Sequence, residues 1–285
     1  LFRALPKVGA RLAAMLELAP VSLPDQPAPV PLPPVAGEKR GRVAVLQGCA
    51  QPVLNPAINA AAMRLLSRMG VEIVDIKDQG CCGALVHHMG REAQAHAQAK
   101  TVIDAFTAEI DNGGLDAIVV TASGCGTTLK DYGFMFRNDP AYAEKAQKIA
   151  SLAKDVTEVV KQFGLPPASD TPDLVVAYHS ACSMQHGQQL RDEPKSLLKQ
   201  AGFVVRDVPE GHICCGSAGT YNLLQPEIAG RLRERKVGNI LKMRLPAFLT
   251  ASIRRPLRRV IRRPKPQSMK GSSAPPMQPM SWRRR

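Results

Sequence analysis

The feature that most constrains the fold of this chain is a cysteine pattern that occurs twice. In each copy, 31 residues separate one cysteine from an adjacent pair, and a glycine follows the pair. A seventh cysteine, Cys125, follows the first copy within a Ser-Gly-Cys-Gly sequence. Such repeated thiols indicate a metal or cluster site, because thiolates from separate loops hold zinc and iron–sulfur clusters. The two copies comprise Cys49, Cys81 and Cys82, and then Cys182, Cys214 and Cys215.

The repeat extends beyond the cysteines. Residues 197–208 match residues 65–76 at an offset of 132, and the cysteines match at an offset of 133. Short apolar runs alternate with helical segments, which is typical of a parallel sheet covered by helices. The sequence therefore predicts an α/β fold of two tandem pseudo-repeated parallel-sheet units, the second incomplete, followed by a disordered C-terminal tail. We expect strands at residues 43–46, 71–76, 115–121 and 174–178, and helices at 56–69 and 91–110.

Every cysteine follows a predicted strand. The carboxyl ends of parallel strands meet at one edge of a sheet, where sites form in open α/β folds. We therefore expect the four thiols of the first half to converge at one edge and the three of the second half at another. The glycines beside the cysteines are expected to allow tight turns that bring amide N–H groups toward sulfur.

Composition divides the chain into five segments. Prolines crowd residues 20–34, which excludes a helix or a central strand there. The predicted segments are a helix and Pro-rich linker (1–41), a first cysteine-rich domain (42–139), a helical linker (140–172), a truncated second cysteine-rich domain (173–242) and a basic low-complexity tail (243–285).

The net charge of +14 comes mostly from that tail. Twelve Lys or Arg and no Asp or Glu lie from residue 243 on, which leaves +2 for residues 1–242. The nearly neutral body argues against nucleic acid as a partner. The tail and the missing initiator Met favour a shifted reading frame or a fragment. The alternative is a genuine basic tail that binds an anionic membrane or nucleic acid.

Several alternatives compete for the thiols. Buried free cysteines behave as small hydrophobes, and a disulfide between adjacent cysteines is geometrically awkward. A thiol–disulfide reductase would carry a Cys-x-x-Cys pair, which is absent. No apolar run of 18 residues and no secretory signal occur, so the thiols fit a reducing cytoplasm.

No catalytic residue is predicted, since no Ser/His/Asp order or paired carboxylates stand out. Five histidines lie near the cysteines, and each is either a surface or core residue or a ligand. His179 and His186 are the best candidates because they share a loop region with Cys182. The others are His87, His88 and His212.

The motifs at residues 46–52, 80–84, 121–126 and 214–221 resemble the tandem cysteine-rich (CCG) domains of redox subunits. Such domains occur in heterodisulfide reductase, anaerobic glycerol-3-phosphate dehydrogenase and lactate-utilisation proteins. The chain resembles above all the iron–sulfur subunits of glycolate oxidase (glycolate dehydrogenase), over about residues 2–241.

The resemblance implies electron transfer by a non-flavin subunit of an oxidoreductase complex. An FAD-containing partner subunit oxidises glycolate to glyoxylate, and the iron–sulfur subunit relays the electrons toward a membrane quinone. Cys49, Cys81, Cys82 and Cys125 would then be ligands of a 4Fe-4S cluster in the first half, and Cys182, Cys214 and Cys215 would be cluster ligands in the second. The protein would lie in the cytoplasm or peripherally at the inner face of the cytoplasmic membrane. The alternative is a zinc (Zn²⁺) site in a structural or interaction module without a redox role.

Two departures from the family matter. Its members begin with a ferredoxin-like module that carries two Cys-x2-Cys-x2-Cys-x3-Cys-Pro runs, and this sequence contains none. The fourth cysteine of the second half is expected near residue 258, where the sequence is Arg-rich. The second half therefore has only three evident thiolates, and its third strand is expected to be missing. Three alternatives stay open for it: a histidine or water completes the site, the site is incomplete, or it is empty.

Overall fold

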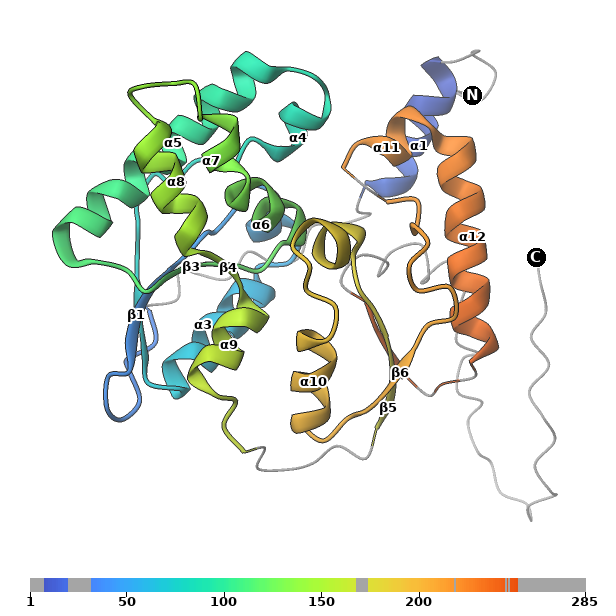
Figure 1. Ribbon diagram of the computed structural model, residues 1–285. Coiled ribbons are helices and arrows are strands. Elements are labelled where there is room, and N and C mark those ends of the chain that lie inside the picture. The colour runs from blue at the N-terminus through green and yellow to red at the C-terminus, as the bar shows by residue number, and fades with distance from the viewer. Residues whose placement is uncertain are drawn as a thin grey trace, which may run out of the picture.

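The computed structural model describes residues 8–19, 32–167, 174–217, 219–243, 245 and 247–250. Two α/β units lie side by side (Figure 1), and each is built on a parallel sheet. The strand order is β2-β1-β3-β4 in the first sheet and β6-β5-β7 in the second. The predicted fold class, two helix-covered parallel-sheet units, is confirmed. The strands of the first sheet are β1 (Gly41–Val45), β2 (Val71–Val74), β3 (Ala117–Val120) and β4 (Ala153–Asp155).

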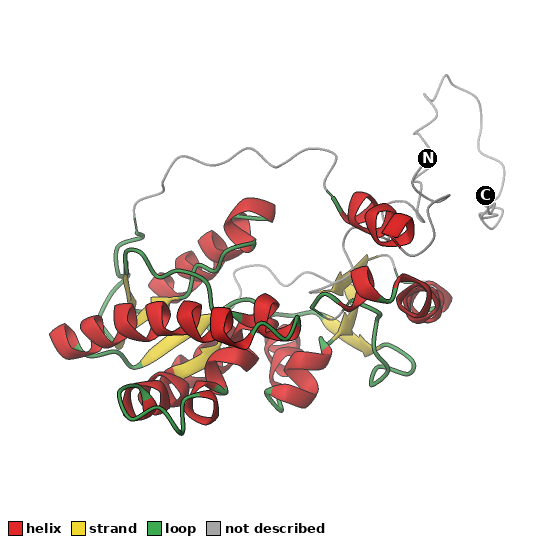
Figure 2. Ribbon diagram, turned by 90° about the horizontal axis from the view of Figure 1, so that it is seen from above, coloured by secondary structure: helices red, strands yellow, loops and turns green. Residues whose placement is uncertain are grey.

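The first sheet is buried on both faces, as parallel sheets usually are. Alternate residues of each strand point to opposite faces, so Val43 and Val45 enter one core cluster and Ala44 enters the other. Figure 2 shows the sheet between two layers of helices. One layer contains α3 (Ala57–Arg68) and α9 (Val156–Phe163). The other contains α5 (Glu92–Gly113), α6 (Ser123–Lys130), α7 (Tyr132–Met135) and α8 (Ala143–Leu152).

The second unit repeats this plan with a smaller core. Its strands are β5 (Val175–His179), β6 (Val204–Asp207) and β7 (Ala247–Thr250). The long helix α12 (Pro226–Lys242) contributes Val237 and Ile240 to a cluster with Ala177 and Val208. The remaining elements are α2 (Gln51–Leu54), α4 (Ala84–His88), the π-helix η2 (Ser183–Gly187), α10 (Glu193–Gln200) and α11 (Tyr221–Leu224).

Two expectations about the chain's organisation need correction. Residues 143–163 are not one helical linker, because β4 interrupts the helices and pairs with β3 at the edge of the first sheet. A three-residue strand is too short to leave a periodic pattern, although Asp155 and Glu158 form the capping box that starts α9. The third strand that we expected to be missing is present, since β7 pairs with β5. Its pairing uses backbone groups, which do not require the absent cysteine.

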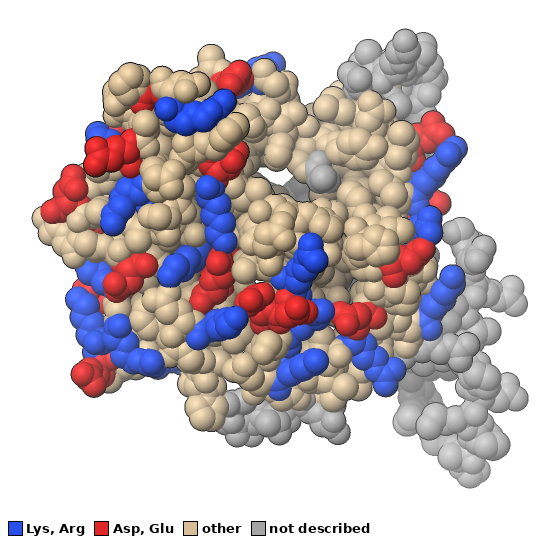
Figure 3. All heavy atoms as spheres, in the orientation of Figure 1, with Lys and Arg blue, Asp and Glu red and all other residues tan. Residues whose placement is uncertain are grey.

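The N-terminal helix predicted from the apolar spacing is present as α1 (Val8–Leu18), and it packs against α11 and α12 (Figure 1). The Pro-rich segment and the basic tail fall largely outside the described residues. No helix of the described part is both long and apolar enough to cross a membrane. Figure 3 shows Lys and Arg interspersed with Asp and Glu over one face, as the near-neutral charge of residues 1–242 predicts.

Candidate metal centre

The four thiols of the first half meet at the carboxyl edge of the first sheet. Cys49 follows β1, the Cys81–Cys82 pair lies between β2 and α4, and Cys125 lies in the first turn of α6 after β3. The sulfurs of Cys49 and Cys81 are 3.4 Å apart. The thiols of Cys82 and Cys125 share a hydrogen bond. The structure therefore brings together all four cysteines that the strand pattern predicted to converge.

These thiols act on one another electrostatically. Burial, together with the hydrogen bond and charge of Cys81, raises the pKa of Cys49 to about 11. The hydrogen bond to Cys125 and burial raise the pKa of Cys82, while the same hydrogen bond lowers the pKa of Cys125. Four crowded thiols resist ionising together in the absence of a cation. A bound metal supplies the missing positive charge and releases their protons.

A network of amides and hydroxyls, which the sequence did not single out, ties the cysteine loops together. The buried Asn59 of α3 donates to the backbone and side-chain oxygens of Gln47, at 3.0 Å each. The hydroxyl of Thr121, just before the Cys125 loop, donates to the Asn59 oxygen at 2.6 Å. Gln79, two residues before Cys81, accepts from the backbone N–H of Gln47 at 3.0 Å. Hydrogen bonds of amide and hydroxyl side chains thus join the three loops that carry the cysteines.

Two further residues hold the Cys81–Cys82 turn. Gly83 has a φ of +82°, a conformation that glycine adopts without steric cost. A Cβ at Gly83 would lie 2.8 Å from the carbonyl oxygen of Ala95 in α5. The hydroxyl of the fully buried Tyr132 donates to the Cys82 carbonyl at 2.9 Å. The turn therefore packs tightly against α5 and α7.

The second half gathers its three cysteines in the same way. Cys182 follows β5 and precedes η2, and its pKa rises to about 11 because of burial and the neighbouring Cys214 and Cys215. The backbone N–H of Gly216 donates to the Cys214 sulfur at 3.3 Å. This contact is the amide-to-sulfur hydrogen bond that the glycine after the pair predicted.

Two buried polar residues accompany the second set of thiols. Lys236 of α12 is only 1% exposed, and its ammonium donates to the carbonyls of Glu210 and Gly211 at 2.7 and 3.3 Å. Burial lowers the pKa of Lys236, against the opposing charges of Cys215 and Cys182. The equally buried His179 has no hydrogen-bond partner for either ring nitrogen among the described residues. Nothing in the sequence distinguishes Lys236 from the other basic residues of α12.

The predicted histidines therefore divide into two groups. His179 lies in the interior at the end of β5, three residues before Cys182, and burial and the charge of Lys236 lower its pKa to about 4. The side chains of the others are exposed at the surface. They are His87, His88, His186 and His212.

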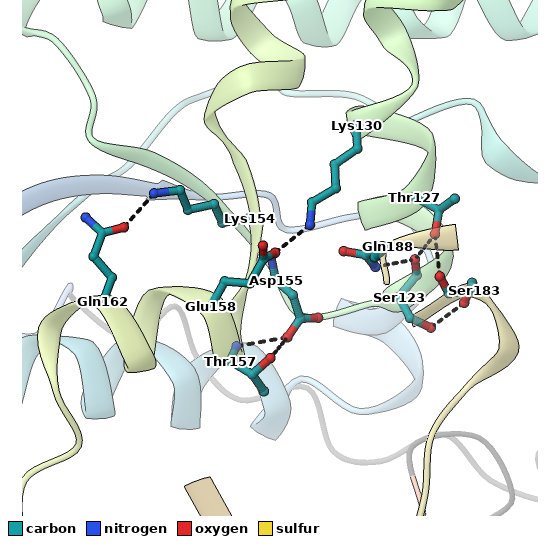
Figure 4. A network of polar contacts seen from close by, with 10 residues as sticks. All are labelled: Ser123, Thr127, Lys130, Lys154, Asp155, Thr157, Glu158, Gln162, Ser183 and Gln188. Carbon is teal, nitrogen blue, oxygen red and sulfur yellow. Dashed lines mark hydrogen bonds and ion pairs between the residues drawn. The ribbon is translucent and has the colours of Figure 1, made fainter. Parts of the chain in front are cut away.

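The two halves touch through the segments around Cys125 and after Cys182. Figure 4 shows the side chains of Ser123 on α6 and Ser183 on η2 facing each other, with 2.9 Å between their hydroxyl oxygens. The hydroxyl of Thr127 donates to the Ser183 carbonyl at 3.1 Å, and the amide of Gln188 donates to the Ser123 carbonyl at 3.0 Å. Cys125 and Cys182 therefore lie next to residues whose hydrogen bonds join the two units.

The donor set of the first half fits an iron–sulfur cluster. Four thiols without a carboxylate among them match the soft donors that clusters and zinc take. The same four thiols are also suitable donors for a tetrahedral zinc site, so the donor types fit either group. Within the described ranges, no three His, Cys, Asp or Glu side chains are already arranged to hold one metal ion.

Comparison with known families gives a match in both halves. The cysteine-rich domain family (CCG) matches residues 43–130 and 176–253, which together make up more than half of the chain. The second matched segment includes β7, in agreement with its pairing to β5.

Individual relatives carry names that refer to iron–sulfur subunits and lactate use. The glycolate oxidase iron-sulfur subunit of Escherichia coli is 39% identical over 254 residues, which cover 88% of this chain and 62% of that protein. The probable glycolate oxidase iron-sulfur subunit of Bacillus subtilis is 30% identical, over 88% of this chain and 56% of that protein. Lactate utilization protein A of Bacillus licheniformis is 26% identical, over 69% of this chain and 81% of that protein. The chain thus spans only part of the length of the first two relatives.

Proposed function

The chain belongs to the cysteine-rich (CCG) domain family, and on that premise we propose that it is an iron–sulfur electron-transfer subunit of a glycolate or related 2-hydroxy acid dehydrogenase. A partner subunit that contains FAD would oxidise the hydroxy acid, and this chain would pass the electrons one at a time toward a membrane quinone. The chain itself would carry no residue that acts on the substrate. Its place would be the cytoplasm or the inner face of the cytoplasmic membrane.

One observation carries the proposal: four thiols from three separate loops lie together at the carboxyl edge of the first sheet. Cys49, Cys81, Cys82 and Cys125 would hold a 4Fe-4S cluster, and a cluster of this kind takes up and releases single electrons. Cys182, Cys214 and Cys215 would hold the corresponding group of the second half. The relatives' names support iron–sulfur binding and an oxidoreductase complex.

The chain's own residues would do three things for such a group. The amide network around Asn59 would hold the cysteine loops in place, so that little rearrangement accompanies electron transfer. The buried Cys82 would lie on the side away from water, and the exposed Cys49 on the solvent side. Electrons would thus enter or leave the cluster through the solvent-exposed side of the site, next to Cys49.

The test is anaerobic reconstitution followed by iron and sulfide analysis and electron paramagnetic resonance. We expect a brown protein with about four irons and four sulfides per loaded site and a paramagnetic signal on reduction. The double variant C81S/C82S should lose the first site, and C214S/C215S should lose the second. A colourless protein without iron and sulfide, or one zinc per chain without sulfide, would refute the proposal.

The redox partner needs a separate experiment. Reconstituted protein is mixed anaerobically with an FAD-containing glycolate dehydrogenase subunit, and glycolate is added. The visible absorbance of the oxidised protein should bleach only when both proteins and glycolate are present. Bleaching by lactate but not by glycolate would keep the electron-transfer role and change the substrate.

A further inference from the structure

The four thiols of the first site fall into an outer pair and an inner pair. In the outer pair, the side chain of Cys49 is exposed and that of Cys81 is half-buried. In the inner pair, Cys82 is only 2% exposed and belongs to the apolar core cluster, and Cys125 packs against the same cluster. A reagent dissolved in water therefore meets the outer pair first.

The two sulfurs of the outer pair are already in contact. The thiol of Cys81 donates a hydrogen bond to the sulfur of Cys49, and the two sulfurs are 3.4 Å apart. The contact arises because β1 and β2 are neighbours in the sheet, so the loops that follow them lie side by side. A disulfide holds its sulfurs at about 2.05 Å, so the pair would have to approach by roughly 1.4 Å.

The backbone beside Cys49 has room for that approach. A Cβ at Gly48, the residue before Cys49, would meet no atom within 4 Å. The turn of the inner pair is fixed by comparison, because a Cβ at Gly83 would lie 2.8 Å from the Ala95 carbonyl oxygen. The outer loop can thus move toward Cys81 without displacing a packed neighbour.

We propose that Cys49 and Cys81 are a site of reversible oxidation, where a small-molecule disulfide converts the two thiols of the metal-free protein into one disulfide. Accessible thiols with a partner thiol beside them are the kind that serve as redox sensors. Disulfides of cytosolic proteins are mostly transient bonds of this type. The bond would occupy two of the four thiols of the first site, so it and a bound cluster would exclude each other. That consequence rests on the proposed function, whereas the disulfide itself does not.

The atoms and electrons of the step balance through thiol–disulfide exchange. The thiolate of one residue of the outer pair attacks the small disulfide R–S–S–R. A mixed disulfide forms, and the departing R–S⁻ takes up a proton. The thiolate of the other residue then attacks the protein sulfur of the mixed disulfide, which closes the Cys49–Cys81 bond and releases the second R–S⁻. The protein has lost two electrons and two protons, and the small molecule has gained both as two thiols.

The competing bonds are disfavoured by position. A bond between the adjacent Cys81 and Cys82 is geometrically awkward. A bond between Cys82 and Cys125 joins thiols that already share a hydrogen bond, but the burial of Cys82 keeps the reagent from its sulfur. We therefore expect oxidation to select the outer pair.

The first measurement maps the bonds in the full chain. Dilute metal-free protein is incubated anaerobically with glutathione disulfide, quenched in acid and alkylated under denaturing conditions, and its linked peptides are identified by mass spectrometry. The peptide that joins Cys49 to Cys81 should exceed any peptide linked through Cys82 or Cys125 by about tenfold or more, and dithiothreitol should remove it. A predominant bond at Cys82 or Cys125, or an outer pair that carries only glutathione, would overturn the inference.

Variants of the outer pair test the second step of the exchange. C49S and C81S should each stop at the mixed disulfide with glutathione, because the thiol that completes the exchange is missing. C125S keeps the outer pair and should still form the bond. A protein disulfide at Cys81 in C49S would contradict the assignment. The map of the wild-type chain requires no variant, so it decides the matter even if a variant folds poorly.

A further measurement separates this inference from the proposed function. Wild-type protein reconstituted with iron and sulfide is freed of excess reagent and treated with the same glutathione disulfide. Loading should lower the yield of the Cys49–Cys81 bond by about tenfold or more, because both sulfurs are then engaged. An equal yield in loaded and metal-free protein would overturn the mutual exclusion. Failure of the protein to take up iron and sulfide would refute the proposed function, while the map of the metal-free chain would still decide the disulfide.

Discussion

The turn after the first cysteine pair offers a test of how tightly the site is packed. Gly83 has a φ of +82° and lies against α5, whereas Gly90 has a similar φ of +73° and a Cβ placed there would meet no atom within 4 Å. Replacing either glycine by alanine forces an L-residue into the left-handed region, at about 1–2 kcal/mol. The two substitutions also reduce the entropy of the unfolded chain equally. Their difference therefore reports only the contact made by the new methyl group.

That contact has a calculable cost. The new carbon in G83A would lie 2.8 Å from the backbone oxygen of Ala95, so α5 or the cysteine turn must shift. Overpacking of this kind costs about 1–3 kcal/mol. We expect G83A to be less stable than G90A by that amount. At about 2–4 °C per kcal/mol for a chain of 150–250 residues, the melting temperatures should differ clearly.

The assay is urea unfolding of the metal-free proteins, followed by circular dichroism, with the midpoints compared at equal slope. Iron content after reconstitution is a second readout, because a shift of the turn displaces Cys82 and should reduce loading in G83A alone. Equal losses of stability in the two variants, within about 0.5 kcal/mol, would refute the claim that the turn is packed against α5.

Two further predictions concern buried polar groups. Y132F leaves the Cys82 carbonyl without its donor and should lower the unfolding free energy by about 1–2 kcal/mol, whereas Y142F, which removes an exposed hydroxyl, should change it by less than about 0.5. Similar losses in the two variants in urea unfolding would contradict this. His179 has a pKa of about 4 in the folded protein, against an ordinary 6.5. Below pH 6.5 the unfolded chain binds a proton there that the folded protein does not, so the free energy of unfolding falls by up to about 3 kcal/mol as the pH drops toward 4. H179L should remove this loss from unfolding curves at pH 7 and pH 5, and an unchanged pH dependence would show that another group is responsible.

Much of the first unit could be predicted from the sequence. The alternation of apolar runs and helical segments identified β1, β2 and β3, and the position of each cysteine after a strand predicted their convergence. These features are local or depend on a general property of parallel sheets. That the thiols bind a cluster remains a prediction, which the experiments above test.

The errors came from elements whose signal is not local. Strand β4 has three residues, so its identity depends on the neighbouring β3 and not on a pattern of its own. Strand β7 was missed because the loss of an expected cysteine was interpreted as the loss of the strand beside it. Hydrogen bonds between strands use the backbone, so a strand can persist after its functional side chains have gone.

By itself, the sequence determined the duplicated α/β plan, the edge of each sheet at which the thiols gather, and the near-neutral body. Only the tertiary structure decided which side chains surround those thiols. Lys236 looks ordinary on α12, yet it is buried, and its ammonium donates to the carbonyls of Glu210 and Gly211, which lie 26 and 25 positions away in the sequence. The physical reason is that burial and electrostatic contact depend on positions in space, which join residues far apart in the chain.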